Sequence, residues 1–200
     1  MKLRKWELAL IMALGISMLL GAGLVREQRE LSDRLIRLHV VANSDSSEDQ
    51  ALKLTVRDAV LAYLKPLLDS VADRAQAAVV IERNMDAISD AARKAVFMRG
   101  HDHDLRVSLG FDRFPTREYE TFTLPAGLYK ALRVEIGANS GRNWWCVVFP
   151  PLCADSAVSA SDALEALDDD QVALITQTES GHVVRFRVLE WIERVRNFIA

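Results

Sequence analysis

The sequence predicts an α+β fold: an antiparallel sheet of about four to five strands packed with two long helices and a C-terminal helix, behind one N-terminal hydrophobic helix. Three features predict this class. An uncharged apolar run occupies positions 8–25, apolar residues recur every three or four positions between 48 and 98, and from 105 onward they alternate with polar ones. Half of the 200 residues are hydrophobic, which is enough for one domain with its own core.

The N-terminal segment is predicted to direct export. Lys2, Arg4 and Lys5 precede the apolar run, and basic residues in this position stay on the cytoplasmic side. The run would be about 27 Å long as a helix, which favours an uncleaved anchor, whereas small residues at 21–23 suit a signal peptidase. Both alternatives remain open. We therefore divide the chain into a signal peptide or signal-anchor helix (1–25), a charged juxtamembrane spacer (26–33) and an exported α+β domain (34–200).

A first strand is predicted at 35–41, with His39 beside Arg37 on one face. A lone histidine there is expected to be a sheet-surface residue rather than a ligand. The polar loop that follows contains Asn43, Ser44 and Asp45, residue types that accept hydrogen bonds from the free N–H groups of a helix start. Capping alone explains these residues, but a polar loop at a sheet end is also a place where partners dock.

Two helices are predicted next, at 48–65 and 70–98. Pro66 is expected to kink or end the first helix. After the second, His101 and His103 alternate with aspartates, and both residue types are good metal ligands. No third and fourth ligand group is apparent elsewhere in the sequence. We therefore expect a solvated loop here, with no metal and no cofactor.

An antiparallel meander is predicted from 105 onward. Its strands are expected at 105–109, 116–124 and 128–136, followed by a last strand from Asn143 to Phe149, with a turn at 110–115 and a hairpin-length loop at 137–141. Alternation gives the last strand two apolar faces, one with Trp144, Cys146 and Val148 and one with Trp145, Val147 and Phe149. Such a strand is either central in the sheet or holds one face ready for a partner.

The two cysteines, Cys146 and Cys153, lie on the predicted exported side, where disulfides persist. A bridge between them and a pair of buried free thiols are both compatible with the sequence. Beyond them, residues 154–170 are small and acidic and are expected to be exposed. The spacing of apolar residues from 188 onward predicts the C-terminal helix.

Composition and motifs exclude several classes of function. The formal net charge of −3 gives no basic surface for nucleic acid. The chain contains no Gly-x-Ser-x-Gly, no glycine-rich phosphate loop, no His-Glu-x-x-His and no Cys-x-x-Cys. Nothing in the sequence ties a cysteine nucleophile to a histidine base. We predict no catalytic residues.

Four blocks in order carry a family resemblance: LHVVANSDSSEDQALKLTVRDAV at 38–60, FPTREY at 114–119, LPAG at 124–127 and NWWCVVFPPLC at 143–153. Together, behind an export segment, they resemble the stage II sporulation protein R family. The resemblance implies a signalling protein made in the forespore and exported into the septal intermembrane space. There it would activate a membrane-embedded aspartic peptidase that processes pro-sigma-E in the mother cell. Residues 154–182 carry no motif of this kind.

This resemblance makes the protein a ligand of the peptidase, so its exposed side chains would do the work. Trp144 or Trp145, whichever faces outward, is the predicted anchor, because aromatic side chains dominate protein contacts. Asn43, Ser44 and Asp45 form a second candidate patch. Packing of the tryptophans in the core is the alternative. Two rival functions are an exported hydrolase with an unrecognised site and a membrane-tethered structural protein of the envelope.

Overall fold

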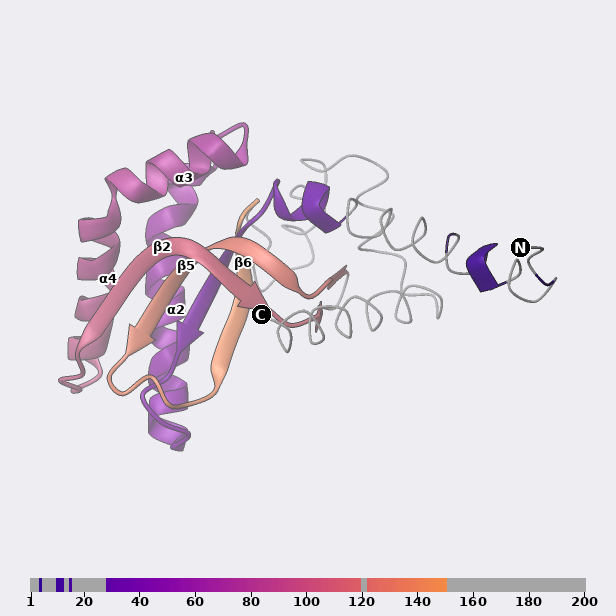
Figure 1. Ribbon diagram of the computed structural model, residues 1–200. Helices are drawn as coiled ribbons and strands as arrows, with labels where there is room; N and C mark the ends of the chain where they lie inside the picture. Colours follow the sequence, from indigo (N-terminus) through magenta and orange to yellow (C-terminus); the bar gives the residue numbers. More distant parts are fainter. Residues whose placement is uncertain (1–3, 5–9, 13–14, 16–27, 120–121, 151–200) are drawn as a thin grey trace.

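The computed structural model describes residues 4, 10–12, 15, 28–119 and 122–150 (Figure 1). The elements in chain order are β1 (Ile36–Val41), α2 (Ser47–Leu68), α3 (Arg74–Arg83), α4 (Met85–Met98), β2 (Leu105–Phe114), β3 (Arg117–Glu118), β4 (Thr123–Leu124), β5 (Gly127–Ile136) and β6 (Asn143–Phe149). This combination of helices and a four-stranded sheet confirms the predicted α+β class. Strands β3 and β4 pair only with each other.

The main sheet has the strand order β2-β5-β1-β6 and is mixed. Strand β1 runs parallel to β5 and antiparallel to β6, and β2 runs antiparallel to β5. The predicted antiparallel meander is therefore wrong in its topology, because β1 lies between β5 and β6. The loop at 137–141 crosses the end of β1 instead of forming a hairpin. All six residues of β1 are buried, which is the burial expected of a central strand.

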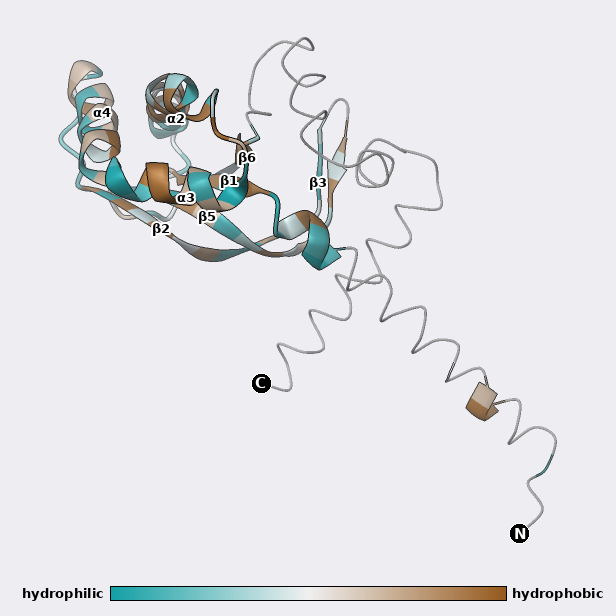
Figure 2. Ribbon diagram, turned by 90° about the horizontal axis from the view of Figure 1, so that it is seen from above, coloured by the Kyte–Doolittle hydropathy of each residue, from teal (hydrophilic) through white to brown (hydrophobic). Residues whose placement is uncertain are grey.

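The three helices α2, α3 and α4 cover one face of this sheet, as Figure 2 shows. Alternate residues of the strands pack against the apolar sides of these helices. Together they form the larger core cluster, which includes Leu38, Val56, Ile88, Leu132 and Val148. A helix hides its apolar stripe by packing on a sheet in this way, and this burial supplies most of its stability. The candidate binding residues are consequently held on a well-packed frame.

A smaller cluster lies on the opposite face of the sheet, toward the β3–β4 hairpin. It is formed by Leu31, Leu35, Phe114, Phe122, Leu124, Tyr129, Ala131 and Val147. Phe149 was predicted to share this face with Trp145 and Val147, but it packs with the helix-side cluster instead. The register between β1 and β6 shifts between Ile36 and Arg37, and such an irregularity moves the residues beyond it to the other face.

The predicted helix at 70–98 is in fact two helices. Asn84 separates α3 from α4, with φ −108° and ψ 13°, outside the helical range. Its side-chain amide donates to the Val80 carbonyl at 2.8 Å, and its oxygen accepts from the Tyr63 hydroxyl at 3.1 Å. These local bonds compete with the helical ladder. The change of direction keeps both helices packed on α2.

Helix α2 continues through Pro66 and ends at Leu68, so the proline neither ends the helix nor marks its boundary. Proline has no N–H, so the helix loses one hydrogen bond near its C-terminus, but the ladder continues beyond it with the Asp69 N–H donating to the Lys65 carbonyl. Leu64 and Leu68 are both buried in the core on this last stretch. Their burial holds the final turn in place.

Strand β2 extends to Phe114, past the turn predicted at 110–115. It pairs with β5 over its whole length, from Leu105 opposite Ile136 to Phe114 opposite Gly127. The burial of Phe114 in the smaller cluster favours this extension. The strand predicted at 116–124 is replaced by the short strands β3 and β4, with residues 120–121 outside the described part.

Several predicted segments lie largely or wholly outside the described residues. They are the apolar run at 8–25, the acidic stretch at 154–170 and the C-terminal helix. Within the described part of the chain, no helix combines the length and the hydropathy that crossing a membrane requires. The described part of the predicted spacer, residues 28–33, packs on the domain, since Leu31 is buried in the smaller cluster and Gln28 donates to the Ala126 carbonyl at 2.5 Å.

Candidate functional site

One end of the sheet collects most of the polar residues that the sequence singles out. Because β1 and β5 are parallel, their carboxyl ends meet there, together with the first residues of β2 and β6 (Figure 1). The loop from β1 into α2 (residues 42–46), the loop from α4 into β2 (residues 99–104) and the loop from β5 into β6 (residues 137–142) all lie at this end. We call these three loops and the first turn of α2 the polar end.

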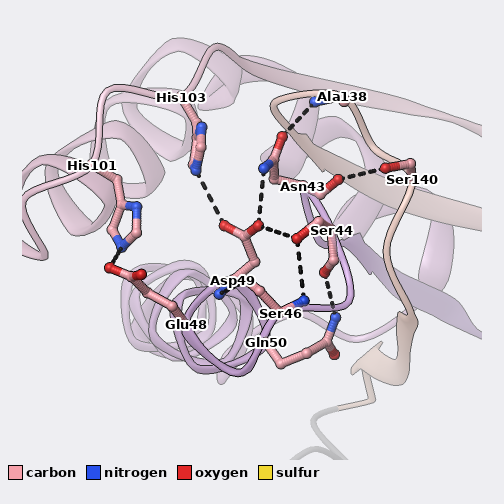
Figure 3. Close-up of polar contacts among 10 residues, drawn as sticks. All are labelled: Asn43, Ser44, Ser46, Glu48, Asp49, Gln50, His101, His103, Ala138 and Ser140. Carbon is pink, nitrogen blue, oxygen red and sulfur yellow. Dashed lines mark hydrogen bonds and ion pairs between the residues drawn. The ribbon is translucent and has the colours of Figure 1, made fainter.

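Asp49 lies at the centre of the polar end, in the first turn of α2 (Figure 3). Its Oδ2 accepts hydrogen bonds from Ser44 Oγ at 2.5 Å and Asn43 Nδ2 at 2.9 Å, while its Oδ1 lies 3.2 Å from His103 Nε2. Its own N–H donates to Ser46 Oγ, the helix N-cap, at 3.1 Å. The hydrogen bond from Ser44, helped by those from Asn43, His103 and Ser46, outweighs burial and lowers the Asp49 pKa to about 2.

Asn43 joins the loop after β1 to the loop before β6. Its Oδ1 accepts from the Ala138 N–H at 2.9 Å, and its carbonyl accepts from Ser140 Oγ at 2.7 Å. Gly137 has a φ of 55°, a conformation that a residue with a side chain rarely adopts, and Gly141 passes directly against the Ser44 carbonyl. The two loops are thus locked together.

Asp45 is the most exposed of the three predicted loop residues, with 63% of its side chain accessible. Its Oδ1 accepts from the Arg142 N–H at 2.7 Å, and the Arg142 side chain beside it is also exposed. Asn43 and Ser44 point inward and donate to the Asp49 carboxylate, while the helix N-cap is Ser46. Of the predicted patch, Asp45 is the residue that the structure presents to solvent.

Lys53 secures the same loops from α2. Its buried ammonium donates to Gln50 Oε1 at 2.6 Å and to the Arg142 carbonyl at 3.0 Å. Burial lowers the Lys53 pKa, and the nearby Arg142 charge adds to this effect. The position of Arg142 is therefore fixed by both backbone and side-chain contacts.

The two tryptophans lie on opposite faces of β6, as the alternation predicts, and both are half-buried. Trp144 packs on the helix-side cluster, with the Arg57 guanidinium 4.3 Å from its ring centroid. Trp145 packs on the smaller cluster, with its ring edge-to-face to Phe114 at 4.8 Å. Each tryptophan thus combines core packing with partial exposure.

His39 is buried, so the expectation of a sheet-surface histidine is wrong. Its Nδ1 lies 2.6 Å from Asp112 Oδ2 and its Nε2 lies 2.8 Å from Asn143 Oδ1. Asp112 also accepts from Arg133 at 3.1 Å. Burial opposes ionisation of Asp112, but the hydrogen bond and charge of His39 outweigh it and lower the Asp112 pKa. A buried imidazole needs a hydrogen-bond partner for each ring nitrogen, and for His39 these partners, Asp112 and Asn143, come from β2 and β6.

Arg37, the neighbour of His39 on this face, is also fully buried. Its Nη2 donates to the Tyr119 hydroxyl at 2.8 Å, and its guanidinium lies 4.0 Å from the Phe114 ring centroid. Within the described part of the chain, its Nε and Nη1 have no hydrogen-bond partner. Burial lowers the pKa of Arg37. Sequence analysis did not predict this burial, because arginine on a strand is normally exposed.

The His101–His103 pair and the start of α2 are far apart in the sequence, but the structure brings them together. His101 and His103 lie against the first turn of α2, where Asp49 completes a group of three residues that could ligate a metal ion. Sequence analysis did not single out Asp49 as a candidate ligand. The sequence signal for this ligand group was a carboxylate at a helix start together with a His-x-His pair after the following helices.

Cys146 takes part in a disulfide. Cys153, the only other cysteine in the sequence, lies outside the described residues. The pairing of these two residues therefore stays a prediction.

Comparison with known proteins places this arrangement in a family. A family model described as stage II sporulation protein R matches residues 32–159, which include every element from β1 to β6. The chain belongs to the stage II sporulation protein R family. A relative with that name from Bacillus subtilis (strain 168) is 31% identical over 182 residues, covering 81% of each chain. No solved structure matches the chain.

Membership in the stage II sporulation protein R family gives the protein a role in sporulation. The family name describes a sporulation protein and not a class of enzyme. The matched region contains both the polar end and the tryptophan strand β6. The candidate site residues at both places therefore lie within the matched region.

Proposed function

We propose that the protein is an exported sporulation signal that activates a membrane-embedded aspartic peptidase in the opposing membrane and so leads to processing of pro-sigma-E in the mother cell. The observation that carries this proposal is the family match, which spans the whole described domain. In this role residues 34–200 lie in the septal intermembrane space, and residues 1–25 are a signal peptide or a membrane anchor. The protein makes and breaks no bonds itself.

Activation without chemistry requires selective binding. A ligand shifts its partner toward the active state only by the difference between its affinities for the active and inactive states. A rigid surface suits this task, because little conformational entropy is lost when it binds. The hydrogen bonds that join residues 42–46 to residues 137–142 supply this rigidity around Asp45 and Arg142.

Asp45, Trp144 and Trp145 are the side chains that we assign to the contact. Asp45 presents an exposed carboxylate at the polar end. Trp144 and Trp145 lie near the start of β6, close to the polar end, and each is partly exposed. Half-buried aromatic residues supply large contact areas while losing little rotamer freedom, as is usual for residues that dominate a binding interface.

A reconstituted system tests the proposal. The full chain, the peptidase and pro-sigma-E are co-expressed in a host without the sporulation pathway, and processing is followed by immunoblot. Processed sigma-E is expected with the full chain and not with a version limited to residues 1–25. Equal processing in the two cases would refute the signalling role.

Single variants test the contact surface in the same system. Trp144→Ala, Trp145→Ala and Asp45→Asn are compared at equal amounts of folded protein. Phe111→Ala is the control for the tryptophans, since Phe111 is exposed on β2 at the other edge of the sheet. Asp86→Asn in the first turn of α4 is the control for charge. At least a fivefold loss is expected for one tryptophan variant, and normal processing in both would exclude β6 as the contact.

The hydrolase alternative receives no support from the described histidines. His39 contacts Asp112 and Asn143, His101 contacts Glu48, and His103 contacts Asp49. A serine or cysteine nucleophile would need a histidine or another base within hydrogen-bonding reach. Turnover of a substrate by the purified chain in the absence of the peptidase would nevertheless replace the signalling role with an enzymatic one.

A further inference from the structure

The imidazoles of His101 and His103 and the carboxylate of Asp49 converge at the polar end (Figure 3). One ligand atom from each of the three residues lies within 4.8 Å of the other two. The two rings stack with 5.2 Å between centroids and 27° between planes, so they face the α2 start side by side. Two imidazoles and a carboxylate form a common ligand set for Zn²⁺ and similar divalent ions.

The loop that carries the histidines is anchored on both sides. Before it, Gly100 has a φ of 77° and donates to the Phe97 carbonyl at 2.9 Å, which ends α4, and Arg99 Nε donates to Thr55 Oγ1 of α2 at 3.0 Å. After it, the Asp104 carbonyl accepts from the Gly137 N–H at 2.8 Å. The histidines therefore meet α2 on a loop that is fixed at both ends.

Asp49 is oriented as a metal-binding carboxylate would be. Its Oδ2 is occupied by the hydrogen bonds from Asn43 and Ser44, and its Oδ1 faces His103. Hydrogen bonds to the second oxygen of a ligating carboxylate fix its direction and are a regular part of metal sites.

We propose that Asp49, His101 and His103 bind one divalent transition-metal ion of the Zn²⁺ type. A tetrahedral ion with bonds of about 2.0–2.1 Å separates its ligand atoms by about 3.3 Å. Asp49 Oδ1 and His103 Nε2 are already 3.2 Å apart. Glu48 lies beside the cluster without being part of it, with its Oε1 3.4 Å from His101 Nε2.

The bound ion would join the start of α2 to the loop between α4 and β2. It would also hold Asp49 against Asn43 and Ser44, and thereby stiffen the loop that presents Asp45. A ligand that binds only the folded state raises its stability in proportion to the logarithm of ligand concentration. Zn²⁺ is therefore expected to raise the midpoint of thermal unfolding as well as to bind.

Titration calorimetry of the full chain tests the site. The protein is purified in detergent with an affinity tag that contains no histidine, stripped with a chelator, and titrated with Zn²⁺ at pH 7.5. One ion per chain is expected for the wild type. His101→Ala, His103→Gln and Asp49→Asn are each expected to weaken binding at least tenfold. His103→Gln keeps a side-chain N–H for Asp49, so it separates loss of the ligand from loss of the hydrogen bond.

Asp102→Asn is the matched control, since this residue lies between the two histidines on the same loop but outside the cluster. Its affinity should stay within twofold of the wild type. Circular dichroism checks the fold of each variant, and Co²⁺ serves as a coloured probe whose visible absorption should be lost in His103→Gln. No saturable binding by the wild type would overturn the site. Wild-type affinity in folded His101→Ala, His103→Gln or Asp49→Asn would overturn it equally.

Discussion

The imidazole of His39 stacks on the indole of Trp145, with 3.8 Å between ring centroids and 19° between ring planes. Strands β1 and β6 place these residues opposite each other in the sheet, since His39 pairs with Trp145 in the register. The stack covers one side of the buried His39 while Asp112 and Asn143 satisfy its nitrogens. Trp145 therefore has a structural role that must be separated from any role in binding.

Replacing Trp145 with alanine is expected to destabilise the domain by about 2 kcal/mol, less than for a fully buried tryptophan because the side chain is half exposed. Trp145→Phe should cost about half as much, since a smaller ring can still stack on His39. Urea unfolding followed by circular dichroism measures both. If the alanine variant loses less than about 0.5 kcal/mol, the stack contributes little to stability. The alanine variant is then a clean probe of processing, whereas a larger loss makes the phenylalanine variant the better probe.

Tyr119 supplies the hydrogen bond to the buried Arg37 guanidinium, and Tyr119→Phe is expected to cost about 1–3 kcal/mol because the charge loses its partner. In an Arg37→Met background the same change should cost about 1 kcal/mol or less, since no charge is left to satisfy. The four proteins form a double-mutant cycle with an expected coupling of about 1 kcal/mol. Additive effects would show that the hydroxyl does not support the guanidinium.

The Asp49 carboxylate is expected to make stability depend on pH. Its pKa of about 2 in the folded protein lies below the value of about 3.9 in an unfolded chain. The resulting stabilisation, about 2 kcal/mol, is fully present above the unfolded pKa and is lost as the pH falls from about 4 toward 2. Asp49→Asn should therefore be less stable than the wild type at pH 6, and the gap should narrow to about a third of that value by pH 2.5.

Urea midpoints measured between pH 2.5 and pH 6 provide this comparison. Asp102→Asn is the control, because Asp102 is an exposed aspartate on the neighbouring loop. A gap between wild type and Asp49→Asn that stays constant over the whole range would contradict the assigned ionisation. The chelator used for metal removal is kept present so that bound ions do not contribute.

Gly141→Ala is expected to destabilise the domain by about 2 kcal/mol or more. A Cβ at this position would collide with the backbone of Ser44, which cannot move without breaking the contacts between residues 42–46 and 137–142. Gly110→Ala is the matched control, since a Cβ there meets nothing within 4 Å. Its main effect is to restrict the flexibility of the unfolded chain. Thermal melts of both variants should differ clearly, and equal midpoints would contradict the close approach.

Local pattern was sufficient for much of the framework. Alternation and the flanking Gly141 and Pro150 predicted β6 from Asn143 to Phe149, where the structure has it. The polar residues after β1 predicted the start of α2, and Ser46 is its N-cap. These features depend on neighbours in the sequence, because strand periodicity and capping act over a few residues. The family resemblance followed from the same short blocks.

Only the tertiary structure decided which strands pair and which distant side chains meet. The pairing of β1 with β5 on one side and β6 on the other buries all six residues of β1, Arg37 and His39 included, in the middle of the sheet, a choice that no local pattern encodes. That pairing brings the loops of the polar end together, and so Asp49 meets His103 across 54 positions of sequence. Sequence fixes the chemistry of each side chain, but convergence depends on the burial of the whole core, which is a property of the folded chain.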